Sequence, residues 1–236
     1  MVAMSETVRV RYAPSPTGEP HLGNIRSALF NWLYARAMGG TFIVRIEDTD
    51  RTRLVEGAQD SILDALRWLN LDWDEGPEVG GAFGPYVQSE RQAQGIYQEH
   101  TDWLIAEGRA YYCYCHPDRL DTMRKAQQVA GISPGYDRRC RDLSDDDRQR
   151  SSEVNRKPVV RFKMPLEGDI LVNDVVRGEV KFDSALLDDF VILKSDSFPT
   201  YHLANVVDDH LMGITHVMRA EEWLPSAPRH IKLYEA

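Results

Sequence analysis

The N-terminal part of the chain alternates between the hydrophobic spacing of strands and that of helices. Residues 8–13 alternate apolar and polar side chains, which predicts a half-exposed strand. Between residues 25 and 37 the apolar positions recur at helical spacing, and Gly39-Gly40 ends the pattern. Residues 41–46 predict a buried strand and residues 55–69 a second helix. This strand-helix-strand-helix order is typical of an α/β layer built on parallel strands.

The middle of the chain has a more broken pattern. Residues 76–86 are rich in glycine and proline and predict a loop, and a helix is expected over 90–107. There follow a Tyr/Cys-rich strand and a basic helical stretch. Three short β segments come next, near 158–164, 170–176 and 179–183. This mixture predicts an inserted domain of mixed α and β structure over residues 108–188.

Beyond the insertion we expect the chain to return to the first layer. Residues 190–194 predict a buried strand that rejoins this layer, and a further strand is expected around 214–219. Helices are expected near 200–210 and from 225 onward. The predicted division is therefore into a first half of the α/β domain (1–107), the insertion (108–188) and an incomplete second half (189–236).

Composition favours a soluble globular protein. The 236 residues (27.0 kDa) are 42% hydrophobic and 28% charged, which suits one large domain or two modest ones. No stretch approaches the ~18 consecutive apolar residues of a membrane span, and the N-terminus lacks the layout of a secretory signal, so we expect no membrane partner. Three cysteines cannot form a disulfide framework, which favours a reducing compartment and a cytoplasmic location.

Positive charge is concentrated in one segment. The net charge is −9, yet residues 119–163 hold 12 Lys and Arg against 7 Asp and Glu. A local basic surface can bind nucleic-acid phosphates while the rest of the protein stays acidic. The alternative is a solvated helix face of mixed charge. The residues we expect to contact phosphates are Arg138, Arg139, Arg148, Arg156 and Lys157.

A proline-rich loop joins the first predicted strand to the first predicted helix. His21 stands at the helix start, where unpaired backbone N–H groups offer a site for phosphate. Gly18 and Gly23 allow a ligand to approach the backbone closely. A histidine in this position can donate to a phosphate whose charge grows during transfer. The alternative is a stiffened turn in which His21 only caps the helix.

Four blocks along the chain match a known pattern. They are Arg11-Tyr-Ala-Pro-Ser-Pro-Thr-Gly-Glu-Pro-His-Leu-Gly-Asn24, Phe42-Ile-Val-Arg-Ile-Glu-Asp-Thr-Asp50, Tyr201-His-Leu-Ala-Asn-Val-Val-Asp-Asp-His210 and Arg219-Ala-Glu-Glu-Trp223. In this order they resemble the signatures of class I aminoacyl-tRNA synthetases, in the form found in bacterial-type glutamyl-tRNA synthetases. The resemblance covers nearly the whole chain and identifies it as the catalytic part of such an enzyme.

The resemblance implies a fold and a reaction. The fold would be α/β, with a Rossmann-like parallel sheet split by an inserted domain that binds the tRNA acceptor stem. The reaction would be activation of L-glutamate with ATP and Mg²⁺, followed by transfer of glutamate to the terminal adenosine of tRNA-Glu. The protein is expected to act as a monomer.

The resemblance also assigns roles to individual residues. Arg11 would pair with the side-chain carboxylate of glutamate, a task for which the forked guanidinium is better suited than lysine. Glu47 would be the counter-ion of the α-ammonium group. The expected catalytic residues are His21 and Arg11. The expected glutamate-binding residues are Arg11, Ala13, Ser15, Glu47, Tyr201, Asn205 and Arg219, and the expected ATP-binding residues are His21, Gly23, Glu222 and Trp223.

Two of these blocks also admit a purely structural interpretation. The acidic run Glu47-Asp-Thr-Asp50 would then cap the end of a strand, and Tyr201–His210 would be an amphipathic core helix.

The three cysteines form a candidate metal site. Cys113 and Cys115 alternate on a predicted strand and therefore face the same side, and Cys140 follows after 24 intervening residues. Some members of the family carry a histidine two residues further on and bind structural zinc, but this chain has Asp142 there. The spacing of Tyr136 and Cys140 resembles a shorter relative in which tyrosine is the fourth ligand. We therefore expect zinc on Cys113, Cys115, Tyr136 and Cys140, with three reduced thiols as the alternative.

The family's Lys-rich second signature does not occur before Ala236, so we expect the sequence to be a fragment with little activity of its own. Two other functions are alternatives for this sequence. The first is the shorter relative that glutamylates a modified base of tRNA-Asp, although residues 76–86 and Glu221-Glu222-Trp223 favour the full synthetase. The second is a non-catalytic RNA-binding module, which leaves Arg11, Glu47 and His21 without a role.

Overall fold

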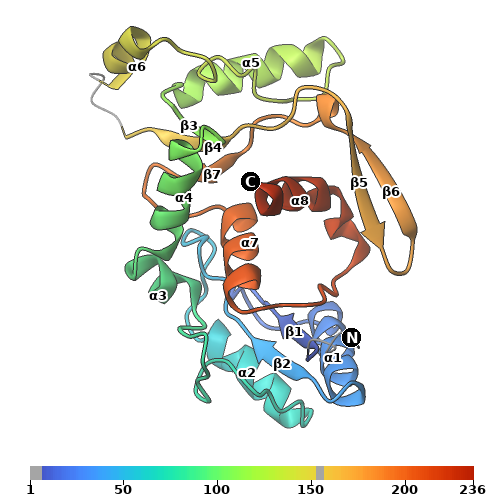
Figure 1. The fold of residues 1–236 in the computed structure, drawn as a ribbon. Coiled ribbons are helices and arrows are strands. Elements are labelled where there is room, and N and C mark those ends of the chain that lie inside the picture. Colours follow the sequence, from blue (N-terminus) through green and yellow to red (C-terminus); the bar gives the residue numbers. More distant parts are fainter. Residues whose placement is uncertain (1–6, 153–156) are drawn as a thin grey trace, which may run out of the picture. The chain divides into compact units, whose positions relative to one another are not determined.

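The computed structural model describes residues 7–152 and 157–236, apart from the side chains of Asp145 and Ser152. The chain divides into two compact units, whose elements are labelled in Figure 1. One unit runs to Ile96 and includes Ala204–Leu224, and the other comprises Tyr97–Leu203 and Pro225–Ala236. The structure has mixed α/β content, as the sequence predicts.

The first unit is built on two parallel strands with helices packed against them. β1 (Arg9–Tyr12) and β2 (Thr41–Val44) pair in parallel, and α1 (Leu22–Ala37) connects them. α2 (Ala58–Trp68) follows β2. The predicted strand-helix-strand-helix order is therefore confirmed, with α1 beginning at the first apolar residue after His21. The core that these elements share includes Val10, Tyr12, Ala28, Ala35, Phe42, Val44, Ile46, Ile62, Leu63, Leu66 and Leu71.

The alternation along β1 separates two environments. Val10 and Tyr12 lie in the hydrophobic core, whereas Arg9 and Arg11 alternate with them and pair with carboxylates. The apolar half of the alternating pattern thus holds the strand against the helices. The polar half leaves Arg11 available for the polar network described below.

The second unit contains an antiparallel sheet and a separate hairpin. β3 (Ala110–Cys113), β4 (Val159–Phe162) and β7 (Val191–Leu193) form the sheet in the order β3-β4-β7. β5 (Asp169–Asp174) and β6 (Gly178–Asp183) form the hairpin. The short β segments predicted between residues 158 and 183 are confirmed.

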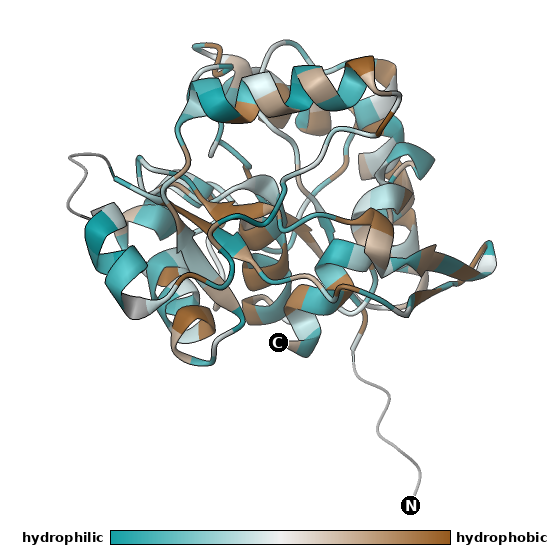
Figure 2. Ribbon diagram, turned by 90° about the horizontal axis from the view of Figure 1, so that it is seen from above, coloured by the Kyte–Doolittle hydropathy of each residue, from teal (hydrophilic) through white to brown (hydrophobic). Residues whose placement is uncertain are grey.

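Helices account for most of the remaining chain. α7 (Tyr201–Leu211) begins in the second unit and continues into the first. Figure 2 shows that helices carry hydrophobic and hydrophilic positions side by side, as their amphipathic spacing predicts. Among the described residues, no helix is long and apolar enough to cross a membrane. The other helices are α3 (Gln88–Ala93), α4 (Ile96–Ala106), α5 (Pro117–Val129), α6 (Asp145–Ser152) and α8 (Ala227–Glu235), and 3₁₀ turns cover Ser184–Leu186 and Glu221–Ser226.

Three sequence predictions require correction. Residues 190–194 do form a strand, but β7 pairs with β4 of the second unit and does not rejoin the β1–β2 layer. Residues 214–219 form no strand, although the Thr215 amide donates to the Arg9 carbonyl at 2.9 Å. The helix expected over 90–107 is two helices separated around Gly95, whose φ of 79° breaks helical geometry. A buried apolar run indicates burial but not the identity of the neighbouring strand.

The junction between α1 and β2 requires glycine at residue 40. A Cβ atom there would lie 2.8 Å from the Val8 Cβ and even closer to the Val8 carbonyl oxygen. Overpacking of this kind costs about 1–3 kcal/mol. We therefore expect Gly40→Ala to lower the free energy of unfolding by that amount, measured by chemical denaturation. Gly135→Ala is the control, because its Cβ would meet Asp188 at an ordinary 3.6 Å. Equal stability of the two variants would contradict the prediction.

Candidate functional site

The loop after β1 delivers His21 to the first turn of α1. His21 is the N-cap of the helix, and its Nδ1 accepts a hydrogen bond from the Gly23 amide at 3.1 Å. His21 therefore does cap the helix, and it does so through one of its two ring nitrogens, Nδ1. Its Nε2 has no partner among the described residues, and both His21 and Gly23 are exposed. The first turn of this helix contains no acidic residue, so no side-chain carboxylate neutralises its positive end, although the amides of Gly23, Asn24 and Ile25 all donate to His21.

Arg11 lies at the end of β1 and already has a carboxylate partner. Its Nε donates to Asp209 Oδ1 at 3.0 Å, and its Nη2 donates to Asp209 Oδ2 at 3.1 Å. Both side chains are buried, with 4% and 2% of their areas exposed. The sequence predicts Arg11 as a substrate-binding group but does not indicate this internal partner.

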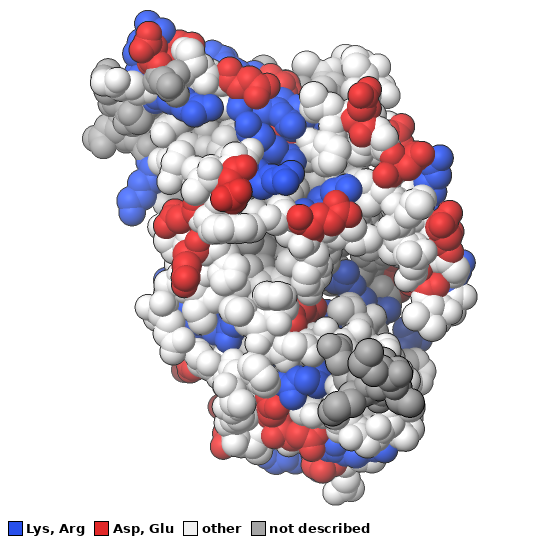
Figure 3. Space-filling model, in the orientation of Figure 1, with Lys and Arg blue, Asp and Glu red and all other residues white. Residues whose placement is uncertain are grey.

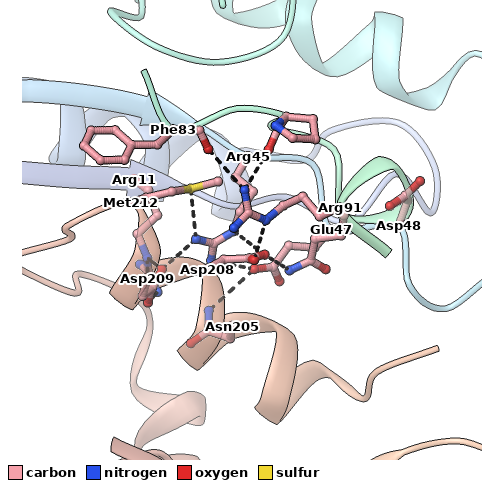
Figure 4. A network of polar contacts seen from close by, with 12 residues as sticks. Arg11, Arg45, Glu47, Asp48, Phe83, Arg91, Asn205, Asp208, Asp209 and Met212 are labelled. Carbon is pink, nitrogen blue, oxygen red and sulfur yellow. Dashed lines mark hydrogen bonds and ion pairs between the residues drawn. The ribbon is translucent and has the colours of Figure 1, made fainter. Parts of the chain in front are cut away.

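A second arginine connects Asp209 to Glu47. Arg45 is fully buried; its Nη1 donates to Asp209 Oδ1 at 2.7 Å and its Nη2 donates to Glu47 Oε1 at 2.9 Å. Asn205 Nδ2 lies 3.5 Å from the same Glu47 oxygen, at the limit of a hydrogen bond. The structure thus brings Arg11, Glu47 and Asn205 together through Arg45 and Asp209, as Figure 4 shows.

The neighbouring acid, Asp208, belongs to a different branch of the network. It accepts from Arg91 Nε at 2.6 Å and from Gln88 Nε2 at 2.8 Å, and both of these residues come from α3. Its distance to Arg45 Nε is 3.7 Å, longer than a hydrogen bond. Asp208 therefore joins α3 to α7 by hydrogen bonds and is linked to Arg45 by a longer ion pair.

Burial and charge act in opposite directions on the acids of this network. Burial tends to raise the pKa of Asp209, but the adjacent Arg11 and Arg45 outweigh it and lower that pKa to about 2. Burial raises the pKa of Glu47 above its ordinary value even though Arg45 opposes the shift. Asp209 is therefore the firmly ionised anchor of the network.

The remaining predicted ligand-binding residues lie in the loop after β1, near the 3₁₀ turn Glu221–Ser226 and at the start of α7. Ser15 is exposed and Ala13 is half-buried, both in the loop after β1. The Arg219 guanidinium lies 5.9 Å from the centre of the Trp223 ring, so these two predicted residues are neighbours. Glu222 is exposed in the same 3₁₀ turn. Tyr201 belongs to the second unit, where its ring packs 5.6 Å from that of His230.

The three cysteines form a compact cluster in the second unit. Their sulfur atoms all lie within 4.8 Å of one another, and Cys115 and Cys140 Sγ are 3.6 Å apart. The Tyr136 hydroxyl lies 3.3 Å from Cys113 Sγ and 3.5 Å from Cys115 Sγ. Among the described residues this is the group of acidic, histidine and cysteine side chains that could hold a metal. Asp142 is largely exposed and lies 4.0 Å from Lys163, away from this role.

Positive charges surround the thiols. The Arg161 guanidinium lies over the Tyr136 ring at 3.7 Å, and Arg119 Nη1 lies 3.6 Å from Cys115 Sγ. The hydrogen bond with Cys140 lowers the pKa of the Cys113 thiol, while the same contact raises the pKa of Cys140. This arrangement stabilises a thiolate on Cys113 that accepts a hydrogen bond from the thiol of Cys140. Burial raises the pKa of the Tyr136 hydroxyl, so metal binding there requires loss of a tightly held proton.

Sequence reasoning missed Arg45, Asp208 and Asp209. A signal was present, because Asp208 and Asp209 lie three and four positions after Asn205 and therefore share its helical face. Three adjacent polar side chains on a face of an otherwise apolar helix indicate buried partners rather than solvent. Their partners on other elements are not visible from the spacing.

Comparison with known proteins places the chain in a family. Residues 7–236 match the family described as tRNA synthetases class I (E and Q), catalytic domain. Glutamate–tRNA ligase of Dehalococcoides mccartyi is 61% identical over 233 residues, which are 99% of this chain and 46% of that protein. Glutamate–tRNA ligase of Fusobacterium nucleatum is 52% identical over 235 residues, 100% of this chain and 46% of that protein.

Solved structures agree with the sequence matches. The crystal structure of a glutamate tRNA ligase from Elizabethkingia meningosepticum in complex with its amino acid has a TM-score of 0.91 at 44% identity, covering 98% of this chain and 47% of that one. Glutamate-tRNA synthetase from Elizabethkingia anophelis gives 0.92 at 44% identity, covering 98% and 48%. This chain thus spans about half the length of the relatives it matches. The family expected from the four sequence blocks is confirmed: the chain belongs to the E and Q family of class I tRNA synthetase catalytic domains.

Proposed function

We propose that this chain is the N-terminal catalytic part of an enzyme that activates L-glutamate with ATP and transfers it to the 3′ end of tRNA-Glu. The observation that carries the proposal is the buried network in which Arg11 and Glu47 are held together. One cation and one anion, fixed by a shared scaffold, complement the side-chain carboxylate and the α-ammonium group of glutamate. The names of the relatives support this choice of substrate.

The residues of the first unit would divide the work between the two substrates. Arg11 binds the glutamate side chain and Glu47 its ammonium group, with Asn205, Arg219, Ser15 and Ala13 completing the site, to which the family pattern adds Tyr201. His21 and Gly23 at the start of α1 face the ATP phosphates, and Glu222 and Trp223 the nucleotide. The α-carboxylate of glutamate attacks the α-phosphorus of ATP and pyrophosphate leaves. His21 donates a hydrogen bond to the negative charge that develops on the α-phosphate. Mg²⁺, when bound with ATP, neutralises phosphate charge and orients the leaving group.

A second candidate is the relative that glutamylates a modified base of tRNA-Asp. The contact of the Tyr136 hydroxyl with the thiols favours it, because that relative shares the Tyr136–Cys140 spacing. Both candidates activate glutamate, so they are distinguished only by the tRNA that accepts it. The identities of 61% and 52% to glutamate–tRNA ligases support tRNA-Glu.

The glutamate assignment is tested by replacing Arg11 in the full-length enzyme. Removal of one partner of a buried charge pair costs about 2–5 kcal/mol, so Arg11→Ala is expected to lower kcat/KM for glutamate at least about thirtyfold. The KM for ATP should change little. The assay is glutamate-dependent exchange of pyrophosphate into ATP in the presence of tRNA-Glu, with tRNA-Asp as the alternative acceptor in a charging assay.

Arg9→Ala is the matched control. Arg9 lies on the same strand and is also paired in a bidentate manner, to Glu75 at 2.9 and 3.0 Å, but has no proposed contact with glutamate. It should alter stability without a selective loss of glutamate use. A wild-type kcat/KM for glutamate in Arg11→Ala would refute the assignment.

We further propose that the cysteine cluster holds a structural zinc ion. Zinc–sulfur bonds of about 2.3 Å place tetrahedral thiolates roughly 3.8 Å apart. The observed separation of 3.6 Å between Cys115 and Cys140 fits that requirement, and Tyr136 would be the fourth ligand. The ion would stabilise this part of the second unit, where α5 buries no residue of its own.

Zinc binding predicts a metal content near one per chain. The full-length protein, purified without chelator and analysed for metal, should contain about one zinc ion, and Cys140→Ser should lose it and lower the melting temperature. Tyr136→Phe distinguishes the ligand sets, because a tyrosine ligand requires that hydroxyl. Zinc-free protein with an unchanged melting temperature would favour three reduced thiols. All three cysteines are free thiols in the structure, which suits the cytoplasmic location proposed for the enzyme.

We propose that residues 108–188 act as the acceptor-stem-binding insertion between two parts of the catalytic domain. Part of the basic excess already has internal partners: Arg138 donates to the Leu187 carbonyl at 2.8 Å, and Arg141 pairs with Asp189 at 2.7 Å. Figure 3 shows Lys and Arg intermixed with Asp and Glu on one face. Arg156 lies outside the described residues. Lys125, Arg139 and Lys157 are exposed and have no ion pair with a described residue.

Phosphate contacts by these three residues predict a salt-dependent affinity. Each phosphate neutralised contributes about 0.7–0.9 to the slope of log K against log salt. The Lys125→Gln/Arg139→Gln/Lys157→Gln variant should therefore bind tRNA-Glu more weakly and show a slope smaller in magnitude by about two to three. Binding is measured by titration at two salt concentrations. Arg67→Gln/Lys232→Gln is the control, since both residues are paired to acids nearby. An unchanged slope in the triple variant would support a solvated surface without a tRNA contact.

A further inference from the structure

Arg45 connects the two groups that are proposed to recognise opposite ends of glutamate. Its guanidinium donates to Asp209 through Nη1 at 2.7 Å and to Glu47 through Nη2 at 2.9 Å. Asp209 accepts in turn from Arg11. The result is a continuous chain from the cation that would bind the side-chain carboxylate to the anion that would bind the ammonium group (Figure 4).

Asp209 also determines which part of Arg11 can meet a ligand. It accepts hydrogen bonds from Nε and Nη2, and so occupies one edge of the guanidinium fork. Nη1 has no partner among the described residues and is not sealed from solvent. A substrate carboxylate therefore meets Arg11 from the Nη1 side.

The charges of this network balance, which limits what charge alone can do. Three arginines (Arg11, Arg45 and Arg91) face three acids (Glu47, Asp208 and Asp209), all with at most 8% of their area exposed. A balanced cluster offers no net charge to attract an anion, so recognition depends on where each donor and acceptor is held. Buried ion pairs of this kind contribute little net stability compared with apolar packing. Apolar side chains could replace the stability of these ion pairs but could not hold the donors and acceptors of Arg11 and Glu47 in fixed positions.

We propose that Asp209 is a positioning residue for glutamate recognition, which acts with Arg45 to hold Arg11 and Glu47 at the separation of the two ends of the substrate. This inference rests on the proposed function. Asp208 provides the internal comparison, because it is also buried but its hydrogen bonds, at 2.6 and 2.8 Å, go to Arg91 and Gln88, and its ion pair with Arg45 is longer at 3.7 Å. A purely structural network predicts the same consequence for the loss of either acid.

The test compares Asp209→Asn with Asp208→Asn in the full-length enzyme. The assay is pyrophosphate exchange with tRNA-Glu present, together with thermal melting. Asp209→Asn should raise the KM for glutamate at least tenfold and leave the KM for ATP within twofold of the wild type. Asp208→Asn should lower the melting temperature while its KM for glutamate stays within twofold. Equal KM values for glutamate in the two variants would overturn the inference.

A double-variant cycle tests whether Asp209 acts through Arg11. If it does, adding Asp209→Asn to Arg11→Ala should lower kcat/KM for glutamate by less than the product of the two single effects, whereas effects that multiply fully would overturn the inference. If Asp209→Asn does not fold, Asp209→Glu retains the charge but displaces the carboxylate by one methylene, and it should raise the KM for glutamate as well. An unchanged KM in a folded Asp209→Glu protein would then overturn the inference.

The same measurements separate the two levels of the argument. A wild-type enzyme without glutamate-dependent exchange would refute the proposed function itself. A wild-type enzyme that uses glutamate and requires Arg11, but whose folded Asp209 variants keep a normal KM for glutamate, would refute only the positioning role.

Discussion

The ion pair between Arg45 and Asp209 is the contact on which the organisation of the first unit depends. It joins the residue directly after β2 to α7 through a hydrogen bond of 2.7 Å between two side chains that are almost completely buried. Charges in such an environment must be compensated, because the loss of one partner costs about 3–5 kcal/mol. Around this pair, Arg11 pairs with Asp209 and Glu47 pairs with Arg45, so each of these four buried charges has a partner.

The parallel pairing of β1 and β2 explains how distant residues reach this pair. Parallel strands end at a common edge, so Arg11 near the end of β1 and Arg45 just after β2 come together there. The loop after β1 then leads into α1, whose N-terminal amides and His21 lie at the start of the same crossover. The layout therefore places the end of β1, with Arg11, and the N-terminus of α1, with His21, on one strand-loop-helix segment.

The sequence predicted those parts of the fold that depend on local spacing. The alternation in β1 and the helical periods of α1 and α2 were sufficient to find these elements, and the four blocks identified Arg11, Glu47 and Asn205. What local spacing cannot contain is the partner. From the sequence, Asp209 is only a polar position on a helix, and its partner Arg11 lies 198 residues away in the chain. The same limit applies to β7, whose apolar residues predict burial and not a place next to β4.

Buried charge also organises the second unit, and this changes the meaning of its basic composition. Asp189 is fully buried and accepts from Tyr111 at 2.8 Å and from Arg141 at 2.7 Å, while Arg161 donates to its carbonyl at 2.7 Å. Arg161 also covers the ring of Tyr136 and thereby supports the thiol cluster. Arginines committed in this way cannot release counter-ions from a phosphate backbone. The positive charge not used in such internal contacts is therefore smaller than the residue count suggests, and it includes exposed side chains such as Lys125 and Arg139.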